Sequence, residues 1–177
     1  PSDLTPLTLS VLVVEDEAFQ QQAMRAMMQI YSERHPSVVF RVTMVDSAAA
    51  AMATLQRRRD FHVVILDVIL PGVRGDVLLP MIRQLLGNHV TVVMVSALGE
   101  MSLIQRCILS GADSFIVKVS ATLQTCPADL PQTYCEPRGS GVYRLYTGYT
   151  GLVYCLTPLS VLVYCLAPLS VREMTSR

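Results

Sequence analysis

The sequence lacks any excess of charge, because Lys and Arg together number 14 and so do Asp and Glu. This balance gives none of the basic surface that nucleic acid or an acidic lipid surface requires, so we expect no nucleic-acid binding by this chain. A CxxC pair is also missing among the five cysteines, and the three histidines are scattered, which argues against a structural zinc site. We therefore expect free thiols in a reducing, cytoplasmic environment.

The first ten residues, PSDLTPLTLS, have neither a basic start nor a long apolar run. They do not match a secretory signal peptide, and we expect residues 1–8 to form a linker. The remaining length suffices for one domain with a single core and an extension, but not for two full domains.

Short β-branched runs alternate with longer amphipathic segments over residues 9–119. This alternation predicts an α/β domain in which helices cover both faces of a doubly wound, five-stranded parallel sheet. The expected strands are 10–16, 38–45, 62–67, 90–96 and 113–118, and the expected helices are 17–34, 47–59, 75–87 and 100–111. Proline is tolerated best in the first turn of a helix, so we expect the third helix to begin close to Pro80.

Reactive side chains come at the carboxyl ends of four predicted strands. Glu15 and Asp16 end the first strand, Asp67 the third, Ser96 the fourth and Lys118 the fifth. In an open parallel sheet these ends meet at one edge, where ligands bind. Clustered carboxylates repel one another and are stable together mainly when a hard cation such as Mg²⁺ neutralises them, while hydroxyl and ammonium groups suit phosphoryl oxygens. The residues therefore predict a site that accepts a phosphoryl group on Asp67.

Four segments, VLVVEDE, VVILDVILPGVRG, VMVSA and GADSFIVK, occur in this order on alternating strands and helices. Over residues 9–119 the chain thereby resembles the receiver domain of two-component response regulators, with a flavodoxin-like fold. The resemblance implies the strand order 2-1-3-4-5.

By this resemblance Asp67 is the phosphoacceptor and Lys118 contacts the phosphate. The implied cofactor is Mg²⁺, held by Asp67 together with Glu15, Asp16 and the backbone carbonyl of Ile69.

Further roles are carried over in the same way. Ser96 and Phe115 match the residues that switch conformation after phosphorylation. Pro71 and Gly75 match the turn after the acceptor strand and the start of the next helix, and Glu17 is expected to face solvent or to support the metal ligands indirectly.

The implied function is a phosphorelay step in which a sensor histidine kinase or a histidine phosphotransfer protein donates its phosphoryl group to Asp67. The resemblance implies no enzyme beyond Mg²⁺-dependent self-phosphorylation and autodephosphorylation. It also implies that a homodimer or an output partner would use the face of the fourth helix and fifth strand.

Two other functions are considered. A pseudo-receiver would keep the fold as a phosphorylation-independent protein-binding module, and it stays open because Val119 stands where receivers typically have proline. A hydrolase of the aspartyl-phosphate kind resembles DxD at its nucleophile, whereas Ile69 stands two residues after Asp67 and argues against it.

The pattern changes after Lys118. Residues 120–141 contain three prolines and no helical period, so we expect the fifth helix to be missing or replaced by an irregular tail over 120–177. Within this tail a ten-residue repeat occupies 153–162 and 163–172. The run 145–170 is charge-free and long enough for a membrane span, but Pro158 and Pro168 disfavour the necessary helix, so we expect a poorly ordered apolar extension.

Overall fold

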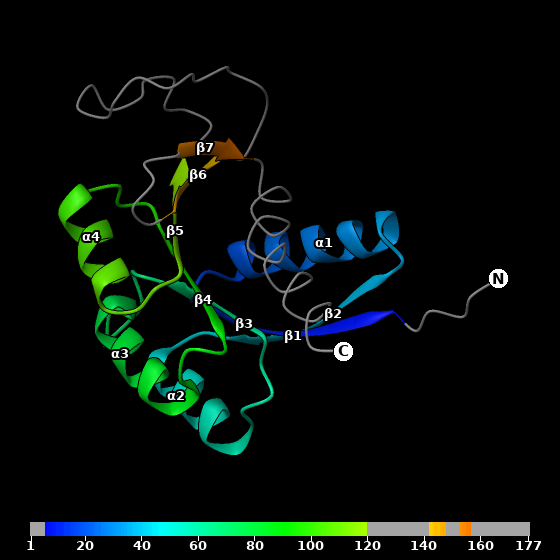
Figure 1. The fold of residues 1–177 in the computed structure, drawn as a ribbon, viewed down its shortest axis with the longest axis horizontal. Coiled ribbons are helices and arrows are strands. Elements are labelled where there is room, and N and C mark those ends of the chain that lie inside the picture. Colours follow the sequence, from blue (N-terminus) through cyan, green and yellow to red (C-terminus); the bar gives the residue numbers. More distant parts are fainter. Residues whose placement is uncertain (1–5, 120–141, 148–152, 157–177) are drawn as a thin grey trace.

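A sheet with helices on both faces makes up the part of the chain that the computed structural model describes, namely residues 6–119, 142–147 and 153–156 (Figure 1). The strands are β1 (Leu7–Val14), β2 (Val38–Val45), β3 (Val63–Asp67), β4 (Thr91–Ser96), β5 (Ser114–Val119), β6 (Val142–Thr147) and β7 (Val153–Leu156). The helices are α1 (Ala18–Arg34), α2 (Ala48–Arg57), α3 (Gly75–Leu86) and α4 (Met101–Leu109).

Five strands are parallel and run in the order β2-β1-β3-β4-β5. This confirms the predicted fold class and strand order. The order reverses between β1 and β3, and a reversal of this kind leaves a crevice at the carboxyl edge of the sheet.

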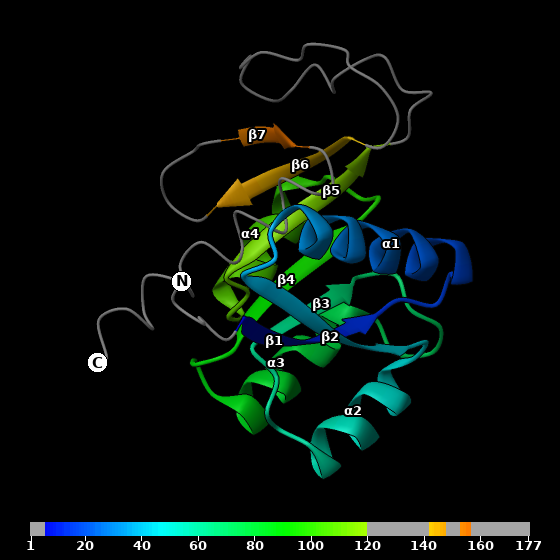
Figure 2. The same cartoon turned by 90° about the vertical axis from the view of Figure 1, so that its right-hand side faces the viewer.

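Two hydrophobic cores lie on the two faces of the sheet. Figure 2 shows α1 on one face, and Met24 and Met28 of this helix pack there with β1 and β3. On the other face α2, α3 and α4 cover a larger core (Figure 1). All five residues of β3 are buried because both faces of this central strand are covered, which explains its continuous apolar run.

The largest differences from the expected boundaries concern two elements. Strand β1 begins at Leu7, because this residue pairs with Val38 on β2, and it ends at Val14, so Glu15 and Asp16 follow the strand. Helix α3 begins at Gly75 and contains Pro80 in its interior. The proline removes one backbone hydrogen bond, but the burial of Leu78, Leu79, Ile82 and Leu86 on the inner face of the helix outweighs that loss.

The sheet continues beyond Lys118, where the sequence predicted no regular structure. Strand β6 pairs antiparallel with β5, and β7 pairs antiparallel with β6. The prediction of a missing fifth helix falls on residues 120–141, and most of the ten-residue repeat falls on 157–172; both lie outside the described residues. In the described part of the chain, no helix combines the length and the apolar character needed to cross a membrane.

Candidate functional site

Three carboxylates meet at the carboxyl edge of the sheet. Glu15 and Asp16 follow β1, and Asp67 is the last residue of the neighbouring strand β3. Each of the three can offer one carboxylate oxygen such that all of these oxygens lie within 4.8 Å of one another. Glu15 and Asp67 are buried, whereas Asp16 is exposed, so the cluster reaches solvent at Asp16.

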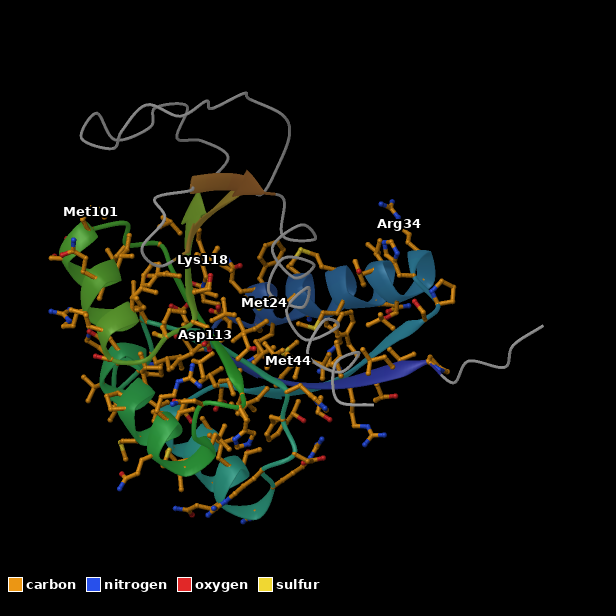
Figure 3. The ribbon with its side chains drawn as sticks, viewed as in Figure 1. Met24, Arg34, Met44, Met101, Asp113 and Lys118 are labelled. Carbon is orange, nitrogen blue, oxygen red and sulfur yellow. The ribbon has the colours of Figure 1, made fainter. Side chains whose placement is uncertain are left out.

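Lys118, which Figure 3 labels on β5, hydrogen-bonds to two carboxylates of this cluster. Its Nζ atom donates to Asp67 Oδ2 at 2.5 Å and to Glu15 Oε2 at 2.7 Å. Burial works against the charged ammonium, but the two hydrogen bonds outweigh it, and the pKa of Lys118 is raised. The lysine is therefore a fixed positive charge between two buried carboxylates.

Glu15 is 1 % exposed, and its environment disfavours its charge. Burial is the largest effect and, with a smaller contribution from the charge of Asp67, raises the pKa of Glu15 to about 7 against the opposing effect of Lys118. The main chain of Glu15 is held on both sides: its N–H donates to the Val45 carbonyl at 3.0 Å, and its carbonyl accepts from Gln21 Nε2 at 2.6 Å. The side chain thus occupies a defined position in spite of the unfavourable surroundings.

The carboxylate of Asp67 is oriented by contacts to both of its oxygens. The amide N–H of Ile69 donates to Oδ1 at 2.8 Å, while Lys118 binds Oδ2. The metal-ligand role of the Ile69 carbonyl stays a prediction. Pro71 lies in the exposed loop that follows, and Gly75 begins α3 directly against the main chain of Asp67.

The two predicted switch residues are both fully buried. The Ser96 hydroxyl at the end of β4 accepts a hydrogen bond from the N–H of Leu98 at 3.0 Å, which ties it to the loop that leads into α4. Phe115 belongs to the core beneath α2, α3 and α4. Glu17 is exposed, as expected, and precedes α1 as its N-cap residue.

The donor set fits a hard divalent cation. Three carboxylates face one lysine ammonium, so the cluster keeps an excess of negative charge that a bound cation would neutralise. Oxygen ligands alone, without histidine or thiolate, suit Mg²⁺, Ca²⁺ or Mn²⁺ rather than zinc or copper. The residues that would hold such an ion are Glu15, Asp16 and Asp67.

Comparison with known proteins identifies the family to which this chain belongs. The family model described as "response regulator receiver domain" matches residues 11–125. The chain belongs to this family. Among curated relatives, the two-component response regulator ORR3 of rice (Oryza sativa) is 28 % identical to this chain over 109 residues, which cover 61 % of this chain and 78 % of the relative.

Solved structures agree on the fold of the receiver domain. A CheX–CheY–BeF₃–Mg²⁺ complex from Borrelia burgdorferi contains a chain that is 26 % identical, with a TM-score of 0.53, over 63 % of this chain and 78 % of that chain. The chemotaxis response regulator CheY4 of Vibrio cholerae is 22 % identical, with a TM-score of 0.54, over 62 % and 86 %. At 22 % identity, the likeness to CheY4 is evidence for a shared fold alone.

Sequence reasoning missed one polar cluster of the receiver domain next to this site. Asp76 in the first turn of α3 accepts hydrogen bonds from Arg74 and, across the space between the helices, from Arg106 of α4 at 3.2 Å. Burial opposes the charge of Asp76, but the hydrogen bond and charge of Arg74 hold its pKa below the usual value. A groove of about 500 Å³ lies beside this cluster and is also lined by Val77 and Leu98. No sequence motif predicts this cluster, because Asp76 and Arg106 are 30 residues apart in the chain.

Proposed function

We propose that this receiver domain accepts a phosphoryl group on Asp67 from the phosphohistidine of a sensor histidine kinase or a histidine phosphotransfer protein. The observation that supports the proposal best is the bridge that Lys118 makes between Asp67 and Glu15, at the edge where Asp16 supplies a third carboxylate. Membership of the receiver family supports the same role for Asp67.

In the proposed step a carboxylate oxygen of Asp67 attacks the phosphorus atom in line with the phosphorus–nitrogen bond. A phosphorus–oxygen bond forms, the phosphorus–nitrogen bond breaks, and the departing imidazole takes a proton from solvent. The Ile69 amide and Lys118 hold the carboxylate in position, and Lys118 then balances the charge of the phosphoryl group. Mg²⁺, bound by the three carboxylates and the Ile69 carbonyl, would spread the charge of the transferred group.

The site offers positioning and charge rather than acid–base chemistry. We therefore expect at most self-phosphorylation from small donors and autodephosphorylation, both Mg²⁺-dependent, and no further enzymatic activity. The proposed output is a population shift in which Ser96 leaves Leu98 for the phosphoryl group and the loop to α4 moves. Phe115 is already buried in this structure, and phosphorylation would hold it in that inward position.

The test is intact mass spectrometry after incubation with acetyl phosphate and Mg²⁺. We expect a single phosphoryl adduct on the wild-type chain, its loss when EDTA replaces Mg²⁺, and its loss in Asp67→Asn. Asp60→Asn is the matched control, because Asp60 is exposed and pairs with Arg58 away from the cluster. This variant should be phosphorylated like the wild type.

Two outcomes would overturn the proposal. An adduct that persists in Asp67→Asn would place the phosphoryl group elsewhere. Absence of an adduct from both acetyl phosphate and a phosphorylated histidine phosphotransfer protein would identify the domain as a pseudo-receiver, the phosphorylation-independent binding module.

A further inference from the structure

The turn that carries Glu15 and Asp16 from β1 into α1 is held by Gln21, a residue near the start of α1. The side-chain amide of Gln21 donates from Nε2 to the Glu15 carbonyl at 2.6 Å. The main-chain N–H of the same residue donates to the Glu17 carbonyl at 3.0 Å. Gln21 therefore fastens two of the three acidic residues of this turn through their carbonyl oxygens.

Asp16 depends on its main chain for its position more than the other two carboxylates of the cluster do. Lys118 hydrogen-bonds to the carboxylates of Glu15 and Asp67. Asp16 is exposed, and within residues 6–119 no hydrogen bond or ion pair holds its carboxylate. The direction of the Asp16 side chain is therefore set by the backbone that carries it.

The Glu15 carbonyl and the Asp16 N–H belong to one peptide unit. A peptide unit is planar, so a hydrogen bond to its oxygen fixes the orientation of the whole unit. On the amino side, the Glu15 N–H donates to the Val45 carbonyl at 3.0 Å. The bond from Gln21 therefore helps to hold the Asp16 carboxylate where one of its oxygens lies within 4.8 Å of oxygens of Glu15 and Asp67.

The position of Gln21 is itself fixed by the core. Met24 and Met28 follow at three and seven residues, on the same side of α1, and both pack with β1 and β3. Because α1 cannot shift along the sheet without uncovering these methionines, it presents the amide at a constant distance from the end of β1. The amide is also uncharged, so it fastens the turn without offsetting the negative charge that attracts a cation, as a lysine or an arginine would.

We propose that Gln21 is a positioning residue for the metal ligands, which acts through the Glu15–Asp16 peptide to keep the Asp16 carboxylate in place for a divalent cation. The inference rests on the Mg²⁺ site of the proposed function but not on phosphotransfer. Without the bond, the Asp16 carboxylate would sample more directions, and ordering it again would cost part of the binding free energy of the cation. The net contribution of one hydrogen bond corresponds to about 3- to 10-fold in an equilibrium constant.

Titration of the full chain with MnCl₂, without a phosphodonor, tests the proposal. Electron paramagnetic resonance measures the free Mn²⁺, an ion that takes the same oxygen ligands as Mg²⁺. Gln21→Met keeps the length of the side chain but removes the donor, and it should raise the dissociation constant of Mn²⁺ about 3- to 10-fold. Gln22→Met is the matched control, because Gln22 is the exposed next residue of α1, and it should leave the constant unchanged. Asp67→Asn should weaken the same binding, which identifies the cluster as the site.

Urea unfolding of Gln21→Met separates positioning from stability. A bond that only stabilises the fold would lower the free energy of unfolding and leave the Mn²⁺ affinity of the folded chain unchanged, and this result would overturn the proposal. Equal weakening by Gln21→Met and Gln22→Met would also overturn it, because the effect would then come from the helix rather than from the bond.

Two further results count against the role of Gln21, namely a wild-type chain that binds no Mn²⁺ at about 10 mM and binding that Asp67→Asn leaves intact. Failure of the proposed function gives a different result. A chain that binds Mn²⁺ as expected but accepts no phosphoryl group would refute the transfer to Asp67 and leave the role of Gln21 supported.

Discussion

Gly75 is the position at which the smallest added group should do the most damage. A Cβ atom built on it would lie 1.9 Å from the Asp67 carbonyl oxygen and 2.9 Å from the Asp67 carbonyl carbon. Both are main-chain atoms of a buried central strand, so they have no rotamer with which to move aside. Gly75→Ala therefore requires the start of α3 to move by more than about 1 Å from the end of β3.

This movement would break a hydrogen bond and disturb the site. The Gly75 N–H donates to the Val68 carbonyl at 2.9 Å, immediately after the proposed phosphoacceptor. Because the clash is with backbone, we expect the upper end of the usual cost of overpacking, about 3 kcal/mol of unfolding free energy, or roughly 100-fold in the unfolding equilibrium. A shift of about 1 Å in the loop between Asp67 and α3 should also misplace the Ile69 N–H that holds the Asp67 carboxylate, and so slow phosphorylation by about 100-fold.

Gly72→Ala is the matched control for the stability measurement. Gly72 has a φ angle of +79° with nothing within 4 Å of its Cβ position, so this substitution adds backbone strain of about 1 kcal/mol without a clash. Urea unfolding followed by circular dichroism gives both free energies, and phosphorylation by acetyl phosphate gives the rates. If Gly75→Ala costs no more stability than Gly72→Ala, the argument from close backbone approach is refuted.

Two further predictions concern residues away from the carboxylate cluster. Arg83→Gln should lower the unfolding free energy by roughly 2 to 4 kcal/mol, because the half-buried Arg83 donates to the Gly111 and Val90 carbonyls at 2.6 Å and also pairs with Asp113. Urea unfolding measures this loss, and a loss below about 0.5 kcal/mol would contradict the prediction. Burial raises the pKa of the Cys107 thiol to about 11, so the unfolded chain ionises first and wild-type stability should fall between about pH 9 and pH 11, by up to roughly 1.4 kcal/mol per pH unit. Cys107→Ala should lack this part of the pH dependence in parallel urea titrations, and equal slopes for the two proteins would contradict the assignment.

The sequence predicted the parallel sheet and the main elements of the site because both depend on local signals. A continuous apolar run such as VVIL ends in Asp67, and the alternation of strands and helices places Glu15, Asp16 and Lys118 at the same edge. The receiver-family model matches residues 11–125, a range that contains the same four segments.

The features that the sequence did not predict depend on tertiary contacts. Pro80 lies inside α3 because burial of the inner face outweighs a local preference. The contact between Asp76 and Arg106 joins side chains that only the packing of α3 beside α4 brings together. The pairing of β6 with β5 links segments separated by more than twenty residues with no regular pattern, so no window of sequence could reveal it.

That last pairing bears on where the domain can be cut. The ladder between β4 and β5 ends at Ser96 and Val117, whereas the ladder between β5 and β6 continues through Lys118, opposite Tyr143, to Val119, opposite Val142. The backbone that carries the lysine is thus aligned by a strand outside the recognisable motifs. A fragment trimmed at residue 119 would retain every residue that the family resemblance names and the pairing of β5 with β4, yet Lys118 and Val119 would lose the backbone partners that β6 provides.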